Sequence, residues 1–165
     1  MPDNEIQEWQ AIFPDLDADY VYETGNRDLT YNCVTWAMGI DDEWIDIDDI
    51  NQTVSDFEAR GFVRTKKNAG EATVHLIGQS EKGHLSHAIV KYRGRRLATM
   101  PDDLWESKMT EGQRFTHNKD GLCGDHWGQI LASLKKKEVE ASPEIKPKKP
   151  IRDKTAKKKK GKRGK

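Results

Sequence analysis

The sequence has few cysteines, no long apolar run and no apolar leader, and each absence excludes a class of protein. Cys33 and Cys123 are the two cysteines among 165 residues, too few for a disulfide framework. No apolar run approaches the ~18 residues that a membrane span requires. The first ten residues, MPDNEIQEWQ, have neither the basic start nor the apolar core of a secretory signal. We therefore expect a soluble cytoplasmic protein that has reduced thiols and no membrane contact.

The formal net charge of zero conceals a separation of charge along the chain. Residues 135–165 carry fifteen Lys/Arg and four Asp/Glu, a net charge of +11, so the remainder has a net charge of −11. We predict one domain over residues 1–138 and a disordered lysine-rich tail over residues 139–165. The tail has no aromatic side chains to stack on bases, so its expected contacts are with phosphates of nucleic acid or with an acidic partner. A solubilising tail that folds back on its own acidic domain is the alternative.

Periodicity predicts helices and strands in an order typical of an α+β fold. Apolar residues at helical spacing, with suitable residues at the ends, predict helices over 4–12, 33–38, 50–60 and 125–138. Runs of β-formers predict strands over 72–79, a hairpin over 87–100 that turns at Arg93-Gly94-Arg95, and a strand at LWESKM. We expect N-terminal helices packed on a small antiparallel sheet of three to five strands, followed by a C-terminal helix.

The stretch Tyr31–Gly39, YNCVTWAMG, contains the first cysteine at the expected start of a helix. Asn32 is a typical N-cap and Gly39 suits the position after the last helical residue. A thiolate in the first helical turn would be stabilised by the helix dipole and by free N–H groups, so Cys33 is a candidate nucleophile. Cysteine is also among the most buried residue types, so a small apolar core residue is the alternative.

A cysteine nucleophile needs a base and a group that orients the base. His87 opens a predicted strand, where a side chain can reach a cleft, although a hydrogen-bonded structural histidine fits the same position. The neighbouring strand offers Glu106 and Ser107, which point to opposite faces, so only one can face His87. The chemistry favours Glu106, because a carboxylate both orients an imidazole and stabilises its charge.

The order of a helix-borne cysteine, a strand-borne histidine and a polar residue is that of papain-like thiol hydrolases. The cysteine and histidine segments resemble those of NlpC/P60 and CHAP amidases. More closely, the chain resembles a poorly characterised microbial domain family over residues 9–134, on the following residues: Tyr31-Asn32-Cys33, Trp36-Ala37, His87-Ala88, Trp105, Ser107-Lys108, His117, Gly124 and Trp127-Gly128. This resemblance implies a papain-like layout and a Cys–His pair, and it favours Ser107 over Glu106. Met109-Thr110 and Trp127 depart from the family pattern.

The resulting hypothesis is a thiol hydrolase or amidase that acts on an amide or peptide. Cys33 would attack the carbonyl, His87 would transfer the proton, and Ser107 or Glu106 would orient the imidazole. The substrate would contact Asn32, Trp36, Trp105, Lys108 and His117. The alternative is a catalytically inactive interaction module with a basic tail.

A metal site and a cofactor are not expected. The segment HNKDGLCGDH brings His117, Cys123 and His126 close in sequence, but the paired spacings typical of zinc ligands are absent. No glycine-rich loop of the kind that binds nucleotide phosphates is present either.

Overall fold

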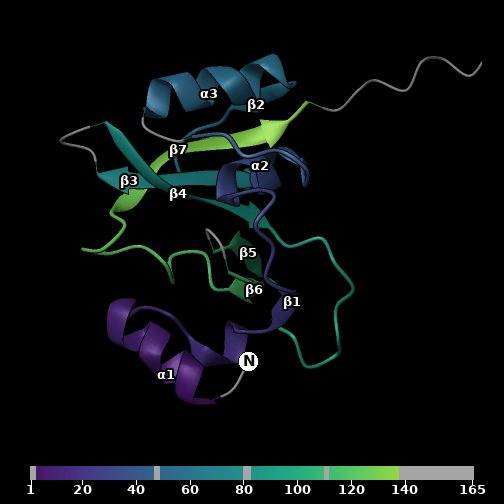
Figure 1. Ribbon diagram of the computed structural model, residues 1–165, viewed down its shortest axis with the longest axis vertical. Coiled ribbons are helices and arrows are strands. Elements are labelled where there is room, and N and C mark those ends of the chain that lie inside the picture. The colour runs from purple at the N-terminus through teal and green to yellow at the C-terminus, as the bar shows by residue number, and fades with distance from the viewer. Residues whose placement is uncertain (1–2, 47–48, 80–82, 110–111, 138–165) are drawn as a thin grey trace, which may run out of the picture.

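The computed structural model describes residues 3–46, 49–79, 83–109 and 112–137, and the predicted tail lies outside this range. The described residues form one antiparallel sheet of seven strands and three α-helices (Figure 1). In chain order the elements are α1 (Asp3–Ile12), a 3₁₀-helix η1 (Ala18–Tyr20), β1 (Glu23–Gly25), α2 (Cys33–Met38), α3 (Ile50–Ala59), β2 (Phe62–Arg64), β3 (Val74–Gln79), β4 (His84–Lys91), β5 (Trp105–Lys108), β6 (Arg114–His117) and β7 (Gln129–Lys136).

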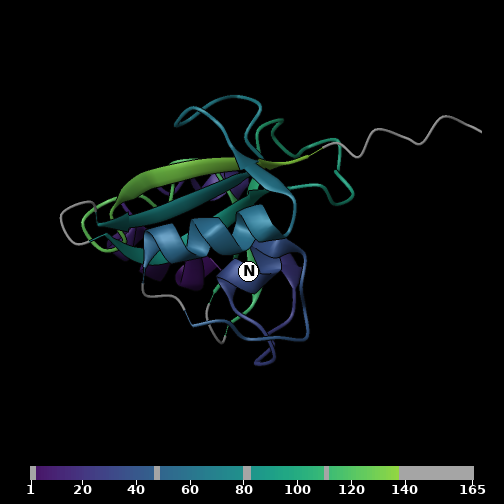
Figure 2. The same ribbon diagram turned by 90° about the horizontal axis from the view of Figure 1, so that it is seen from above.

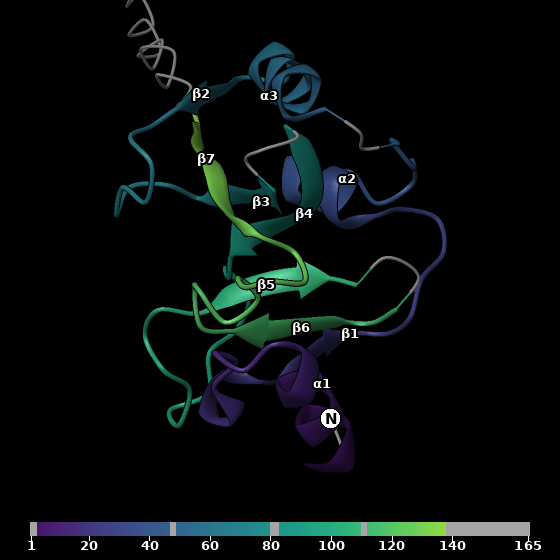
Figure 3. The ribbon, with the colours of Figure 1, turned by 90° about the vertical axis from the view of Figure 1, so that its left-hand side faces the viewer.

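The strands lie in the order β1-β6-β5-β4-β3-β7-β2. This sheet contradicts the expected fold class, because it is larger than three to five strands and the helices are minor elements. The papain-like layout expected with that class is therefore also wrong. Figure 3 shows the result of this order, with α1 near β6 and β1 at one end of the sheet and α3 near β2 at the other.

The largest error is the helix predicted over residues 125–138, because Gln129–Lys136 form strand β7 instead. β7 pairs with β3 on one side and with β2 on the other, so it is an interior strand. The predicted hairpin is also wrong in part, because β4 ends at Lys91 and its neighbour β5 begins only at Trp105. Strands β1 and β6 were not predicted. The strands at β3, β4 and β5 were predicted.

The three predicted N-terminal helices are present, and their ends have the expected chemistry. The Asn32 side chain accepts hydrogen bonds from the backbone N–H groups of Val34 and Thr35, which satisfies the first turn of α2. Gly39 ends that helix in the left-handed region, at φ +84°. Asp49 caps α3 in the same manner as Asn32.

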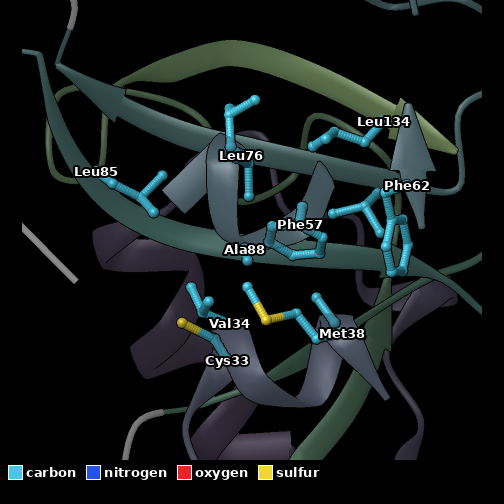
Figure 4. Close-up of a cluster of buried hydrophobic side chains, with 12 residues drawn as sticks. Cys33, Val34, Met38, Phe57, Phe62, Leu76, Leu85, Ala88 and Leu134 are labelled. Atoms are coloured by element: carbon cyan, nitrogen blue, oxygen red, sulfur yellow. The ribbon is translucent and has the colours of Figure 1, made fainter. Parts of the chain in front are cut away.

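The sheet has a different hydrophobic core on each face. The first core packs α2 and α3 on the sheet, and Figure 2 shows both helices along the same side of β3, β4 and β7. Its residues include Cys33, Val34, Met38, Phe57, Phe62, Leu76, Leu85, Ala88 and Leu134 (Figure 4). The second core packs α1 and the loop that precedes β7 on the opposite face, with Phe13, Leu16, Ile77, Ile89, Trp105, Phe115, Leu122 and Ile130.

An irregularity in β4 decides which of its side chains reach each core. The β3–β4 register shifts between Ile77 and Gly78, so one extra β4 residue is accommodated between Leu85 and His87. Leu85 and Ala88 consequently both pack in the first core, although they are three residues apart. His87 and Ile89 then point to the second face, because neighbouring strand residues alternate.

None of the described helices is long and apolar enough to cross a membrane.

Candidate functional site

Cys33 is a buried member of the first core. Its residue surface is 4% exposed, and it lies among aliphatic side chains of α2, α3 and the sheet (Figure 4). Burial raises the pKa of the Cys33 thiol to about 11, and the nearby backbone N–H of Ala88 offsets only part of this effect. The thiol is therefore protonated at neutral pH. A buried, protonated thiol is the opposite of the reactive state that a nucleophile requires.

His87 lies on the other face of the sheet. Its ring stacks on Trp127 at 4.0 Å between centroids, in the layer that includes the loop before β7. The next residue, Ala88, is the one that packs with Cys33. Because consecutive strand residues point in opposite directions, the β4 backbone separates the His87 imidazole from the Cys33 thiol. The predicted Cys33–His87 pair is not assembled in this structure.

Ser107, rather than Glu106, is the β5 residue beside His87. The Ser107 Oγ lies 3.0 Å from His87 Nε2 and 2.8 Å from His117 Nε2. The partners assign the protons: His117 Nδ1 lies 2.7 Å from the Asn118 carbonyl oxygen and must donate to it, which leaves His117 Nε2 as an acceptor. Ser107 then donates to His117 and accepts from His87.

This His87–Ser107–His117 network is sealed from solvent, since its members are between 0% and 2% exposed. Burial lowers the pKa of His87 to about 3 and the pKa of His117 to about 4, so both imidazoles are neutral at pH 7. Ser107 Oγ and both ring nitrogens of His117 have hydrogen-bond partners, and the Cys33 thiol lies on the other face of the sheet. The network's contribution is to satisfy polar groups within the core.

A third buried histidine on the same face also has a serine hydroxyl as its partner. His75 Nδ1 lies 2.9 Å from the Ser133 hydroxyl, and the His75 ring stacks on Trp105 at 4.3 Å. Burial lowers the pKa of His75 to about 4. Trp105, which was expected to contact substrate, is thus a core residue with 3% exposure.

Glu106 points to the first face, away from His87. Its carboxylate accepts a hydrogen bond from the Thr24 hydroxyl at 2.5 Å and lies 4.0 Å from Arg114 Nη1. Burial raises the pKa of Glu106, while Thr24 and Arg114 act in the opposite direction. The indole N–H of Trp36 is near enough to lower this pKa slightly but makes no hydrogen bond. Glu106 therefore belongs to a polar cluster that joins β1, β5, β6 and α2.

Arg114 holds this cluster together through packing as well as charge. Its guanidinium lies 4.1 Å from the centroid of the Trp36 ring, a cation–π contact. Its other neighbour is Gly25, where a Cβ would collide with the guanidinium group. Glycine at this position thus permits Arg114 to lie flat between β1 and Trp36.

This polar cluster forms part of a cavity of about 400 Å³ between α2 and the sheet, which we call the Trp36 pocket. Its polar or charged lining residues come from five strands and the loops that follow them, and its apolar ones come mainly from α2, β2 and β4. The lining comprises Thr24, Trp36, Ala37, Met38, Gly39, Phe62, Thr73, Val74, Val90, Lys91, Tyr92, Arg93, Gly94, Glu106, Arg114 and Lys136. A cavity of this size is typical of small-molecule sites.

A family model described as a domain of unknown function, DUF7689, matches residues 22–135. The chain belongs to the DUF7689 family. This match agrees with the resemblance to a poorly characterised family, and it provides no support for the resemblance to NlpC/P60 and CHAP amidases. Comparisons with curated proteins and with solved structures give no significant match.

In this DUF7689 domain, two further residues that were expected to bind substrate make hydrogen bonds within the fold instead. Asn32 caps α2 and also donates from its side-chain amide to the Ile45 carbonyl at 2.5 Å. Lys108 is 0% exposed, and its ammonium donates to the backbone carbonyls of Asp28, Met109 and Gly112. The hydrogen bonds of Lys108 connect the loop before α2 with the segment between β5 and β6.

Of the residues predicted for the site of the DUF7689 domain, only Trp36 and Glu106 line the Trp36 pocket. Sequence reasoning missed Thr24 and Arg114, because β1 and β6 were not recognised as strands. The alternation Arg114, Phe115, Thr116, His117 was the available signal, but four residues are too few to identify a strand reliably. Within the described ranges, no group of three or more His, Cys, Asp or Glu side chains is arranged to hold a metal ion.

Proposed function

We propose that this DUF7689 domain is a non-catalytic binding module that contacts the phosphates of nucleic acid through a basic surface at the end of β7. The observation that carries the proposal is a depression of about 450 Å³ lined by Arg93, Lys135, Lys136 and Lys137, together with Glu71 and Thr73. Four cations and one carboxylate give this depression a net charge of +3. We call it the basic depression.

Most cations of the basic depression are available to a ligand. Lys135 pairs with Glu71 at 2.6 Å. Lys136 lies over the Phe62 ring at 5.4 Å, and among the described residues no carboxylate forms an ion pair with Arg93, Lys136 or Lys137. Exposed cations without an ion-pair partner gain more from phosphate binding than cations already paired, because they lose no existing ion pair.

The sequence that follows β7 continues the same charge. Residues 138–165 contain twelve Lys/Arg and four Asp/Glu and no aromatic residue. Lysine side chains bind phosphate as point charges, and a segment without aromatic residues has no means of stacking on bases. A long polyanion of regularly spaced phosphates therefore matches this composition better than a folded acidic protein, which would need apolar anchors for affinity.

The alternative of a thiol hydrolase has less support from the geometry. Cys33 is buried with a raised pKa, and the β4 backbone lies between it and His87. Catalysis would require the first core to open and the imidazole to change faces of the sheet. A binding module requires neither change.

The proposal is tested by the salt dependence of binding to a fluorescent single-stranded oligonucleotide, measured by anisotropy on the full chain. We expect the association constant to fall at least about tenfold between 50 and 200 mM salt, because released counterions drive phosphate binding. Lys136→Glu should weaken binding by about tenfold. Lys119→Glu is the matched control, since Lys119 follows β6 and lies outside the basic depression, and it should change the affinity less than about twofold.

Three outcomes would overturn the proposal. The first is an affinity that does not change with salt, and the second is equal effects of Lys136→Glu and Lys119→Glu. The third is complete displacement of the oligonucleotide by polyglutamate at equal charge concentration, which would identify an acidic protein as the preferred partner.

A further inference from the structure

We propose that the Trp36 pocket binds a small amphipathic anion, a molecule whose flexible apolar body carries one negatively charged headgroup, as in a medium-chain fatty acid. This binding does not depend on the proposed function, because the apolar walls of the pocket have no part in contacting the phosphates of nucleic acid. Three properties of the pocket favour such a ligand: the apolar walls, the covered aromatic rings and the distribution of charge.

The walls of the Trp36 pocket are apolar in its middle. Val74 of β3 pairs with Val90 of β4, and Val90 pairs with Glu106 of β5, so these three side chains form a row across the first face. Ala37 and Met38, at the end of α2, also line the pocket. Val90 packs against the first core but stays partly exposed. An apolar ligand body would remove this surface from water, which is the main source of affinity for such ligands.

Two aromatic rings of the pocket have faces that are occupied by protein groups. The Arg114 guanidinium lies 4.1 Å from the centroid of the Trp36 ring, and Tyr31 contacts the same ring at 5.8 Å. The Lys136 ammonium lies 5.4 Å from the centroid of the Phe62 ring, and Phe62 is 4% exposed. A planar ligand gains its specific affinity from a free ring face, whereas an aliphatic chain needs only apolar contact. These two rings therefore favour an aliphatic body.

Two of the four cations in the pocket already have carboxylate partners. Arg114 lies 4.0 Å from Glu106, and Lys91 lies 3.1 Å from Asp103. Arg114 and Glu106 belong to β6 and β5, so the charges at this end of the pocket are compensated. An anionic headgroup would gain little there, because it would compete with an existing carboxylate.

The other two cations are available to a headgroup. Arg93 and Lys136 are exposed, and among the described residues neither forms an ion pair. Both line the pocket together with Thr73, whose hydroxyl can donate to an anion. Lys136 lies on β7, and β3 and β4 separate β7 from β5 in the sheet. Three strand spacings amount to roughly 14 Å, so the ligand has an elongated body between its headgroup and the Glu106 end.

A free molecule fits the pocket better than a lipid bilayer does. The large apolar side chains that are exposed among the described residues all lie outside the lining, namely Ile12, Leu29, Trp44 and Leu97. Insertion into a bilayer needs apolar side chains that project from the surface beside the cations. The cavity of about 400 Å³ between α2 and the sheet instead has the size of a small-molecule site.

The test is a calorimetric titration of the full chain with three compounds below their micelle-forming concentrations. Decanoate carries the proposed headgroup and body, decyltrimethylammonium reverses the charge, and 2-naphthoate replaces the chain by a planar ring system of similar carbon number. We expect one decanoate per chain. Decanoate should bind at least about tenfold more tightly than decyltrimethylammonium and at least about fivefold more tightly than 2-naphthoate.

Two neighbouring lysines locate the headgroup. Lys136→Glu should weaken decanoate binding at least about tenfold, because it replaces an attraction by a repulsion at the mouth of the pocket. Lys137→Glu is the matched control, since Lys137 lines the basic depression but not the Trp36 pocket. It makes the same change in net charge and should weaken decanoate binding less than about twofold.

Two valines locate the apolar body. Val90→Thr places a hydroxyl on the wall at nearly constant volume and should weaken decanoate binding at least about threefold. Val63→Thr is the matched control, because Val63 is a partly exposed residue of β2 outside the lining. It should change the affinity less than about 1.5-fold.

The wild-type titrations decide the proposal even if a variant does not fold. Absence of decanoate binding, equal affinity for decanoate and decyltrimethylammonium, tighter binding of 2-naphthoate, or equal effects of Lys136→Glu and Lys137→Glu would each overturn it. Binding to phosphatidylglycerol vesicles without binding of free decanoate would identify a membrane surface and would also overturn it. None of these titrations contains nucleic acid, so their failure leaves the proposed function standing, and an oligonucleotide affinity that does not change with salt leaves the pocket standing.

Discussion

The buried polar side chains on the two faces of the sheet have different hydrogen-bonding environments. On the second face, beneath α1, His87, Ser107 and His117 satisfy one another in a sealed network. On the first face, beneath α2, Glu106 and Arg114 border a cavity and leave donors without partners. The difference teaches that burial of titratable groups is not sufficient to mark a functional site. Unpartnered donors are not sufficient either, because Trp105 Nε1, in the core of the second face, is also buried without a hydrogen-bond partner in the described part of the chain.

The comparison also locates the residues of the family pattern. Asn32, Cys33, Lys108, Ser107 and His117 are each 0% to 4% exposed. Their contacts cap a helix, fill a core, fasten a loop and complete a hydrogen-bond network. Such residues maintain the fold, and none of the five lines the Trp36 pocket.

The largest predicted effect is a loss of stability at mildly acidic pH, which comes from the second face. His87, His75 and His117 have folded pKa values of about 3, 4 and 4, below the value of 6.5 for an unperturbed histidine. As the pH falls, the unfolded chain therefore binds protons before the folded protein does. The contribution of these three histidines to the free energy of unfolding is present above about pH 6.5 and is lost progressively below it. Between pH 7 and pH 5 each histidine should reduce the free energy of unfolding by about 2 kcal/mol.

Urea unfolding at pH 7, 6 and 5 measures this effect above the range in which ordinary carboxylates titrate. An unfolding free energy that does not change between pH 7 and pH 5 would show that these imidazoles are not buried as neutral groups.

A smaller effect is expected from removal of one member of the network. His87→Ala should lower the free energy of unfolding by about 3 kcal/mol, because it leaves a cavity beside Trp127 and removes a hydrogen-bond donor from Ser107. His84→Ala, on the same strand but exposed, is the control and should cost less than about 0.5 kcal/mol. Equal costs in chemical denaturation would contradict a sealed network on the second face.

The smallest expected effect concerns Cys33 on the first face. Cys33→Ala should lower the free energy of unfolding by only about 1 kcal/mol, because the side chain is small and alanine retains most of its packing. In a Cys123→Ala background, the native thiol should react with an aromatic disulfide reagent at pH 8 far more slowly than the unfolded chain does. A native thiol that reacts faster than the unfolded chain would contradict the burial of Cys33 and would support its role as a nucleophile.

The sequence was sufficient for elements whose signals are local. Asn32 and Gly39 bound α2 through capping chemistry, and Gly61 follows α3 with a left-handed φ of +84°. Strands β3, β4 and β5 were predicted from their β-formers. These signals act within a few residues and do not depend on the rest of the molecule.

The sequence was not sufficient to predict elements whose structure is determined by pairing with strands distant in the sequence. Trp127, just before β7, and Ile130, Leu131 and Leu134 within it have helical spacing. A register shift opposite Leu76 and Ile77 interrupts the alternation that would have indicated a strand. For the candidate site, the order of cysteine and histidine was visible, but the face of β4 covered by α2 was not. Because neighbouring strand residues point to opposite faces, the face of β4 that α2 covers decides whether His87 lies on the same side as Cys33. The same alternation on β5 decides whether Glu106 or Ser107 lies beside His87.

The interior position of β7 has a consequence for the synthesis of the protein. β2 pairs with the rest of the sheet only through β7, and β3 needs β7 for one of its two edges. Residues 129–136 are translated after all the other strands. The ribosome therefore exposes a nascent chain whose β2 has no partner strand until residues 129–136 emerge, so this sheet cannot be completed while its earlier strands alone are outside the ribosome.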